Sequence, residues 1–169
     1  MGDLQFAIPV LTLLFGANVW LWRRFRRTDA HTSPVYHMAA AIAVSLGALT
    51  LMAGIGHSVA VIGLALSEPE YGTLQVLRLT TGALLVYSGA MGVALFRAIK
   101  SGQHLAIAVA AASASLFVVY LLVIRPIGGA DTVPPMLALW SIYLVALTLS
   151  GAVAMRGRLW RMHSVPPAI

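Results

Sequence analysis

Five long apolar stretches, separated by short polar segments, dominate this sequence. The charges in the polar segments alternate in sign along the chain. Basic residues follow the first, third and fifth apolar stretches, whereas Glu68 and Glu70 follow the second and Asp131 follows the fourth. Short cytoplasmic loops of multi-pass membrane proteins accumulate Lys and Arg, so this alternation indicates an integral membrane protein with a defined orientation.

The composition agrees with this interpretation. Of the 169 residues, 60% are hydrophobic and only 9% are charged, whereas soluble domains carry about 25% charged residues. The net charge of +6 does not indicate a nucleic-acid partner, because the basic residues stand at the ends of apolar stretches, where they fix orientation and attract anionic lipid headgroups. We therefore expect the chain to lie in a lipid bilayer, in a plasma membrane of the bacterial or archaeal inner-membrane type. The lack of cysteine excludes thiol catalysis, disulfides and thiolate metal sites.

The predicted fold is an all-α bundle of five transmembrane helices, forming a single transmembrane domain over residues 1–169. About 20 helical residues cross a hydrocarbon core of about 30 Å. All but Arg78 and Arg125 of the eleven Lys and Arg residues then lie on one side, which places the N-terminus outside and the C-terminus in the cytoplasm. The predicted helices span residues 4–22, 34–57, 73–96, 104–124 and 136–155.

The second apolar stretch, over residues 35–66, is too long for one untilted span and too short for two. We predict that its helix ends near His57 and that residues 58–66 form a short segment on, or dipping into, the outer face. Two full spans would place the arginines that begin at Arg23 and those that begin at Arg97 on opposite sides of the membrane. Whether residues 58–66 are re-entrant, interfacial or a continuation of the helix is left open.

Small residues predict where the helices touch one another. In lipid an apolar side chain does not mark the protein interior, whereas small residues allow two backbones to approach closely. We predict helix-packing roles for Gly16 in the first helix and for Gly82, Gly89 and Gly92 in the third. Ordinary packing within the chain is the first explanation of the third-helix glycines, and dimerisation or docking onto a partner subunit is the alternative.

Arg78 is the one charge well inside a predicted span. In one interpretation its side chain extends to the outer surface and pairs with Glu68 or Glu70. In the other it lines a polar cavity and binds an anionic group, a quinone carbonyl or a lipid headgroup. The candidate cavity-lining residues are Gln75, Arg78, Thr81, Ser141 and Thr148.

His37 and His104 stand at similar depth near the starts of the second and fourth predicted helices. Two axial histidines from facing helices can hold a haem b, which makes this pair a candidate cofactor site. Interfacial histidines without a ligand are the alternative. No predicted helix contains a carboxylate, and no hydrolase or nucleotide-binding motif is present, so we predict neither catalytic residues nor a metal site.

These features favour a non-enzymatic membrane subunit that packs within a larger membrane protein complex, alongside other membrane subunits or further copies of itself. Two other hypotheses are kept open. One is a small-solute or ion transporter or channel that acts as an oligomer, and the other is a haem- or quinone-linked redox subunit.

Overall fold

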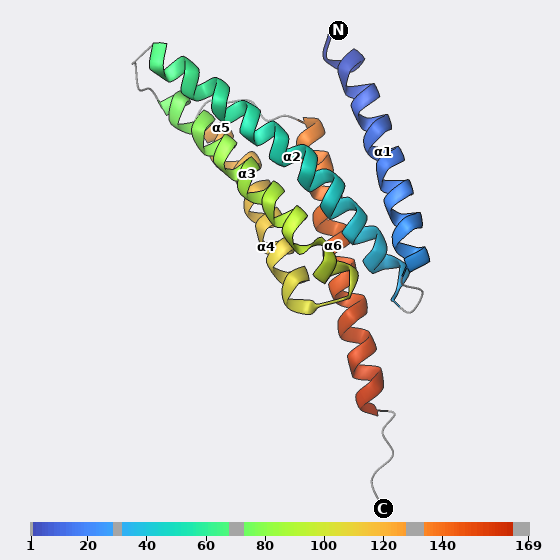
Figure 1. Ribbon diagram of the computed structural model, residues 1–169. Coiled ribbons are helices and arrows are strands. Elements are labelled where there is room, and N and C mark those ends of the chain that lie inside the picture. Colours follow the sequence, from blue (N-terminus) through green and yellow to red (C-terminus); the bar gives the residue numbers. More distant parts are fainter. Residues whose placement is uncertain (1, 29–31, 68–72, 128–133, 164–169) are drawn as a thin grey trace, which may run out of the picture.

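The computed structural model describes residues 2–28, 32–67, 73–127 and 134–163, and these ranges are helical almost throughout, with no strand among them (Figure 1). The fourth long helix has three consecutive parts, α4, a π-helical turn η1, and α5. The elements are α1 (Gly2–Thr28), α2 (Pro34–Ser67), α3 (Thr73–Lys100), α4 (His104–Val119), η1 (Tyr120–Ile124), α5 (Arg125–Ile127) and α6 (Pro134–His163).

Four of these helical segments are long and apolar enough to cross a membrane, over residues 34–64, 75–100, 104–127 and 137–156. Each exposes many large apolar side chains on its outer surface, such as Met52, Leu116 and Leu149. A water-soluble protein rarely exposes apolar surface on this scale. The prediction of an all-helical, multi-pass membrane protein is therefore confirmed.

The predicted end of the second helix near His57 is wrong. Helix α2 continues for 34 residues to Ser67, so residues 58–66 are its last turns. Gly56 and Gly63 do not interrupt it, because in lipid no water competes for the backbone hydrogen bonds. A helix of this length is about 50 Å long, so it must tilt or project beyond the hydrocarbon core.

The fourth helix also runs past its predicted end at Ile124, as far as Ile127. Pro126 has no backbone N–H, and its ring crowds the carbonyl four residues earlier, on Leu122. The preceding turn widens into the π-helical η1, and the Arg125 N–H donates to the carbonyl of Tyr120, five residues back. This wider turn lets the chain pass the proline without ending the helix.

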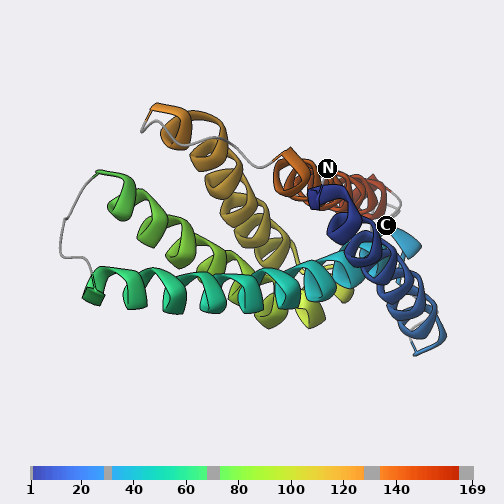
Figure 2. The ribbon, with the colours of Figure 1, turned by 90° about the horizontal axis from the view of Figure 1, so that it is seen from above.

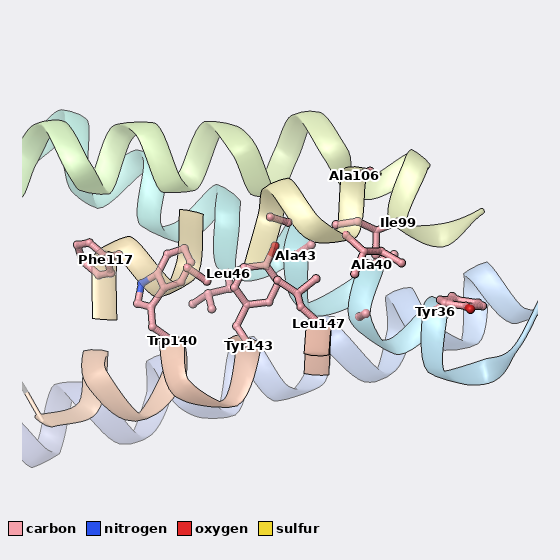
Figure 3. Packing of buried hydrophobic residues seen from close by; sticks show 14 of the residues in the cluster. Tyr36, Ala40, Ala43, Leu46, Ile99, Ala106, Phe117, Trp140, Tyr143 and Leu147 are labelled. Carbon is pink, nitrogen blue, oxygen red and sulfur yellow. The ribbon is translucent and has the colours of Figure 1, made fainter. Parts of the chain in front are cut away.

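Helices α2 and α3 form a long antiparallel pair (Figures 1 and 2), with α4 against α3 and with α6 against both α4 and α2. Phe117, Trp140, Tyr143 and Leu147 belong to one buried core with alanines of the first half of α2, such as Ala40 and Ala43 (Figure 3). Helix α1 lies on the outside and packs against α2. The C-terminal ends of α1, α3 and α6, which carry the basic residues, all lie toward the lower end of Figure 1.

Candidate functional site: the small-residue faces of α2

The inner face of α2 meets α3 backbone to backbone. A Cβ atom at Gly89 would lie 2.7 Å from the carbonyl oxygen of Gly47 and would collide with the backbone of Leu51. A Cβ at Gly92 would lie 2.6 Å from the carbonyl oxygen of Ala43. These contacts leave no room for any side chain, so only glycine allows the two helices to approach this closely.

The same contact continues toward the other end of the pair. A Cβ at Gly54 would lie 2.7 Å from the backbone nitrogen of Val86, and a Cβ at Gly82 would collide with the Ser58 hydroxyl. His57 Nε2 lies 3.0 Å from the Arg78 carbonyl oxygen, which accepts its hydrogen bond. Gly82, Gly89 and Gly92 therefore all lie in an intramolecular seam.

Two α2 glycines of this seam, Gly47 and Gly54, are absent from the predicted packing residues. Their spacing of seven residues equals that of Gly82 and Gly89 on α3. A seven-residue repeat keeps one side of a helix facing its partner. The equal glycine spacing in two consecutive apolar stretches therefore could have identified Gly47 and Gly54 from the sequence.

The opposite side of α2 carries a second set of small residues. Ala53, Gly56 and Ala60 are exposed, and a Cβ at Gly56 would have nothing within 4 Å. At about 100° per residue, these three positions fall within an arc of about 60° on the far side of α2 from Gly47 and Gly54. Gly63, one turn further on, also has open space beside it. We call Ala53, Gly56 and Ala60 the outer face of α2.

Gly16 packs against no other helix among the described residues, because a Cβ there would have nothing within 4 Å. Helix α1 is attached to α2 through Asn18 instead. The Ser45 hydroxyl donates to Asn18 Oδ1 at 2.9 Å, and Asn18 Nδ2 donates to the Leu14 carbonyl at 2.8 Å. Asn18 was identifiable as an amide inside an apolar stretch, where a polar side chain is expected to find a partner on a neighbouring helix.

The residues predicted to line a polar cavity differ in their exposure. Thr81 is buried, Gln75 and Ser141 are half-buried, and Arg78 and Thr148 are exposed. The Thr148 hydroxyl donates to the carbonyl of Leu144 on its own helix at 2.6 Å. The predicted ion pairs of Arg78 with Glu68 or Glu70 lie outside the described residues.

Thr81 instead belongs to the contact between α3 and η1. Its hydroxyl lies 2.7 Å from that of Tyr120, and both hydroxyls lie within 2.8 Å of the Leu77 carbonyl oxygen. Tyr120 is absent from the predicted residues, since nothing in the sequence indicates which tyrosine reaches a carbonyl on another helix. This closed hydrogen-bonded set fixes the position of η1 against α3.

The inner face of α6 does not include Thr148, one of the predicted cavity-lining residues. Trp140, Tyr143, Leu147 and Ser150 are almost fully buried, whereas Thr148 faces outward. Trp140 makes edge-on contacts with Phe117 and Tyr143, at centroid distances of 5.2 and 5.4 Å. Large aromatic side chains therefore fill this part of the bundle.

The two candidate haem ligands lie at the same end of the bundle. His37 is 1% exposed and directly follows Tyr36, whose ring packs at Gly102, while His104 is half-buried two residues beyond Gly102. Among the described residues, no group of three or more His, Asp or Glu side chains could hold a metal ion. A haem b between His37 and His104 stays a hypothesis, which the visible absorption spectrum of the purified protein tests.

In comparisons with protein-family models, curated proteins and solved structures, none matches this chain.

Proposed function

We propose that this protein is a non-enzymatic integral membrane subunit that packs within a larger membrane protein complex through the outer face of α2. One observation supports the proposal above the others, namely the open space beside Gly56 on a face made of small residues. Helices in lipid associate through close van der Waals packing and not through a hydrophobic driving force. A face of Ala53, Gly56 and Ala60 permits that close approach, as the glycine seam does on the other side of the same helix.

The occupant of this face is a further transmembrane helix, supplied by a second copy of this chain or by another subunit. The transporter hypothesis has no comparable support, because Arg78 and Thr148, two of the residues assigned to its path, are exposed. The redox hypothesis depends on a haem held by His37 and His104, and the visible absorption spectrum of the purified protein distinguishes it from the proposed packing role.

In this proposal the chain spans the membrane five times, with α1 as the first span. Helix α1 has 27 residues, enough to cross a hydrocarbon core of about 30 Å. The basic ends of α1, α3 and α6 then share the cytoplasmic side of the plasma membrane, with the N-terminus outside and the C-terminus inside.

This topology predicts the pattern of labelling by a membrane-impermeant thiol reagent. The chain has no cysteine, so single cysteines in the wild-type background report one position each. We expect labelling from outside at Glu70→Cys and Thr132→Cys, and labelling only after permeabilisation at Thr28→Cys, Ser101→Cys and Ser164→Cys. Labelling of positions 70 and 101 from the same side would contradict the five-span arrangement.

The packing role predicts the effect of enlarging the outer face. The association constant between the chain and its partner should fall about tenfold or more in the double variant Gly56→Leu, Ala60→Leu. The reason is that two leucines hold the partner helix away. The measurement is the mass of the detergent-solubilised complex by light scattering, together with identification of its components by mass spectrometry. The variant should fold as the wild type does, since both positions face away from the rest of the chain.

The matched control is Ile55→Leu, Ile62→Leu, because both isoleucines are 51% exposed at similar depth on another side of α2. This control should assemble as the wild type does. A folded outer-face variant with unchanged mass and unchanged components would overturn the proposed docking face.

A further inference from the structure

A pocket of about 580 Å³ lies where the C-terminal ends of α1 and α3 meet the first half of α2. Three of its lining side chains are cationic, and none of its lining residues is acidic. The lining residues are Leu21, Arg24, Phe25, Thr28, Val44, Phe96, Arg97, Lys100 and Ser101.

Two aromatic rings hold Lys100 and Arg97, while the Arg24 guanidinium lies 5.2 Å from the Trp20 centroid on its own helix. Phe25 of α1 and Phe96 of α3 stack with ring centroids 6.0 Å apart. The Lys100 ammonium lies 5.5 Å from the Phe25 centroid and donates to the Thr28 hydroxyl at 3.2 Å. The Arg97 guanidinium lies 5.8 Å from the Phe96 centroid. Thr28 and Lys100, which are 72 positions apart in the sequence, are thereby brought into contact.

The pocket carries an excess of positive charge. Asp29 follows Thr28 in the sequence, but one carboxylate cannot balance Arg24, Arg97 and Lys100. The negative ends of the α1 and α3 helix dipoles reduce the repulsion among these cations only partly. An anion with several acceptor oxygens would complete the balance, and a phosphate matches the planar fork of arginine.

The depth of the pocket identifies the source of that phosphate. Helix α3 is a candidate membrane span that ends at Lys100, so the pocket lies at the level of the lipid headgroups. Thr28 and Ser101 also line the pocket, and the apolar side chains of Leu21 and Val44 lie on the side toward the hydrocarbon core. Cationic groups at headgroup level above apolar walls match an amphiphile with an anionic head.

We propose that this pocket binds one anionic phospholipid, with the headgroup phosphate held by Arg24, Arg97 and Lys100 and an acyl chain lying against Leu21 and Val44. This inference does not depend on the docking role of the outer face of α2, which lies on a different part of that helix.

The test is native mass spectrometry of the full chain with phosphatidylglycerol or with phosphatidylcholine of the same acyl chains. We expect one molecule of phosphatidylglycerol to bind preferentially. The variant Arg24→Gln, Arg97→Gln should bind it about twenty-fivefold more weakly, at about fivefold for each arginine. Its thermal midpoint in phosphatidylcholine should match the wild type, which shows that the fold is intact.

The matched control is Arg23→Gln, Arg27→Gln. It removes the same number of positive charges, both from the C-terminal end of α1, but neither arginine lines the pocket. Its decrease in affinity for phosphatidylglycerol should be less than a third of the decrease seen in the pocket variant. An equal decrease in both variants would overturn the pocket, because it would show diffuse attraction to the membrane surface. Displacement of the lipid by millimolar inorganic phosphate would also overturn the lipid assignment, since it would show that the headgroup anion alone accounts for binding.

Discussion

Replacing Gly89 by leucine should abolish stable folding of the α2–α3 pair. A Cβ at this position would already lie 2.7 Å from both the Gly47 carbonyl oxygen and the Leu51 Cα. These are backbone atoms of a helix and cannot move aside as a flexible side chain would. The two helices must separate along the seam, which removes the van der Waals contacts that hold them together. The measurement is the yield of monodisperse protein after detergent extraction, with the thermal midpoint of whatever fraction is recovered.

Two controls separate this steric effect from the general cost of altering a helix. Gly56→Leu makes the same substitution on α2 where a Cβ has nothing within 4 Å, and it should leave the fold of the chain intact. Met91→Leu changes a half-buried residue of α3 at nearly constant volume and should also be tolerated. Recovery of Gly89→Leu with the yield and midpoint of these controls would show that the seam is not close-packed.

Replacing Trp140 by alanine should lower the free energy of unfolding by about 3 kcal/mol, the lower end of the range for deleting a buried aromatic side chain. Trp140 is 1% exposed and contacts Phe117 on α4 and Tyr143 on α6. The lower end applies because removal from lipid provides less driving force than removal from water, while the cavity and the lost ring contacts remain. Reversible unfolding in mixed micelles with increasing sodium dodecyl sulfate measures this difference.

Leu149→Ala is the control on the same helix, since Leu149 is 58% exposed. It should change the free energy of unfolding by less than about 0.5 kcal/mol. If the Trp140 and Leu149 variants were equally stable, the aromatic cluster could not be the core of the bundle.

The existence of the helices and their membrane class follow from the sequence, because runs of apolar residues with charged boundaries permit few other structures. The α3 glycines were also identifiable as packing residues. Gly82, Gly89 and Gly92 fall on one side of a helix, and small residues in lipid mark the places where two helices approach closely. The end of α2 was not identifiable in the same way. Glycine weakens a helix in water, and that rule loses its force where no water competes for the backbone.

The faces of the other helices were harder to predict because two kinds of packing operate in this bundle. Small residues mark contacts where helices touch backbone to backbone, as at Gly47, whereas the buried side chains of Trp140 and Tyr143 mark contacts that large aromatic rings fill. In lipid an aromatic residue on the inner face and one on the outer face look alike in the sequence. The pairing of Thr81 with Tyr120 depends on the register between two helices, which the spacing of residues along one helix does not specify.

Site-specific photo-crosslinking in native membranes tests directly whether the outer face of α2 packs against another helix. A small diazirine-bearing amino acid replaces Ala53, Gly56 or Ala60 on the outer face, and Ile55 or Ile62 as the lipid-facing comparison. We expect crosslinks to a protein, either a second copy or another subunit, from the three outer-face positions, and crosslinks to lipid alone from Ile55 and Ile62. Lipid adducts alone from all five positions would contradict this packing.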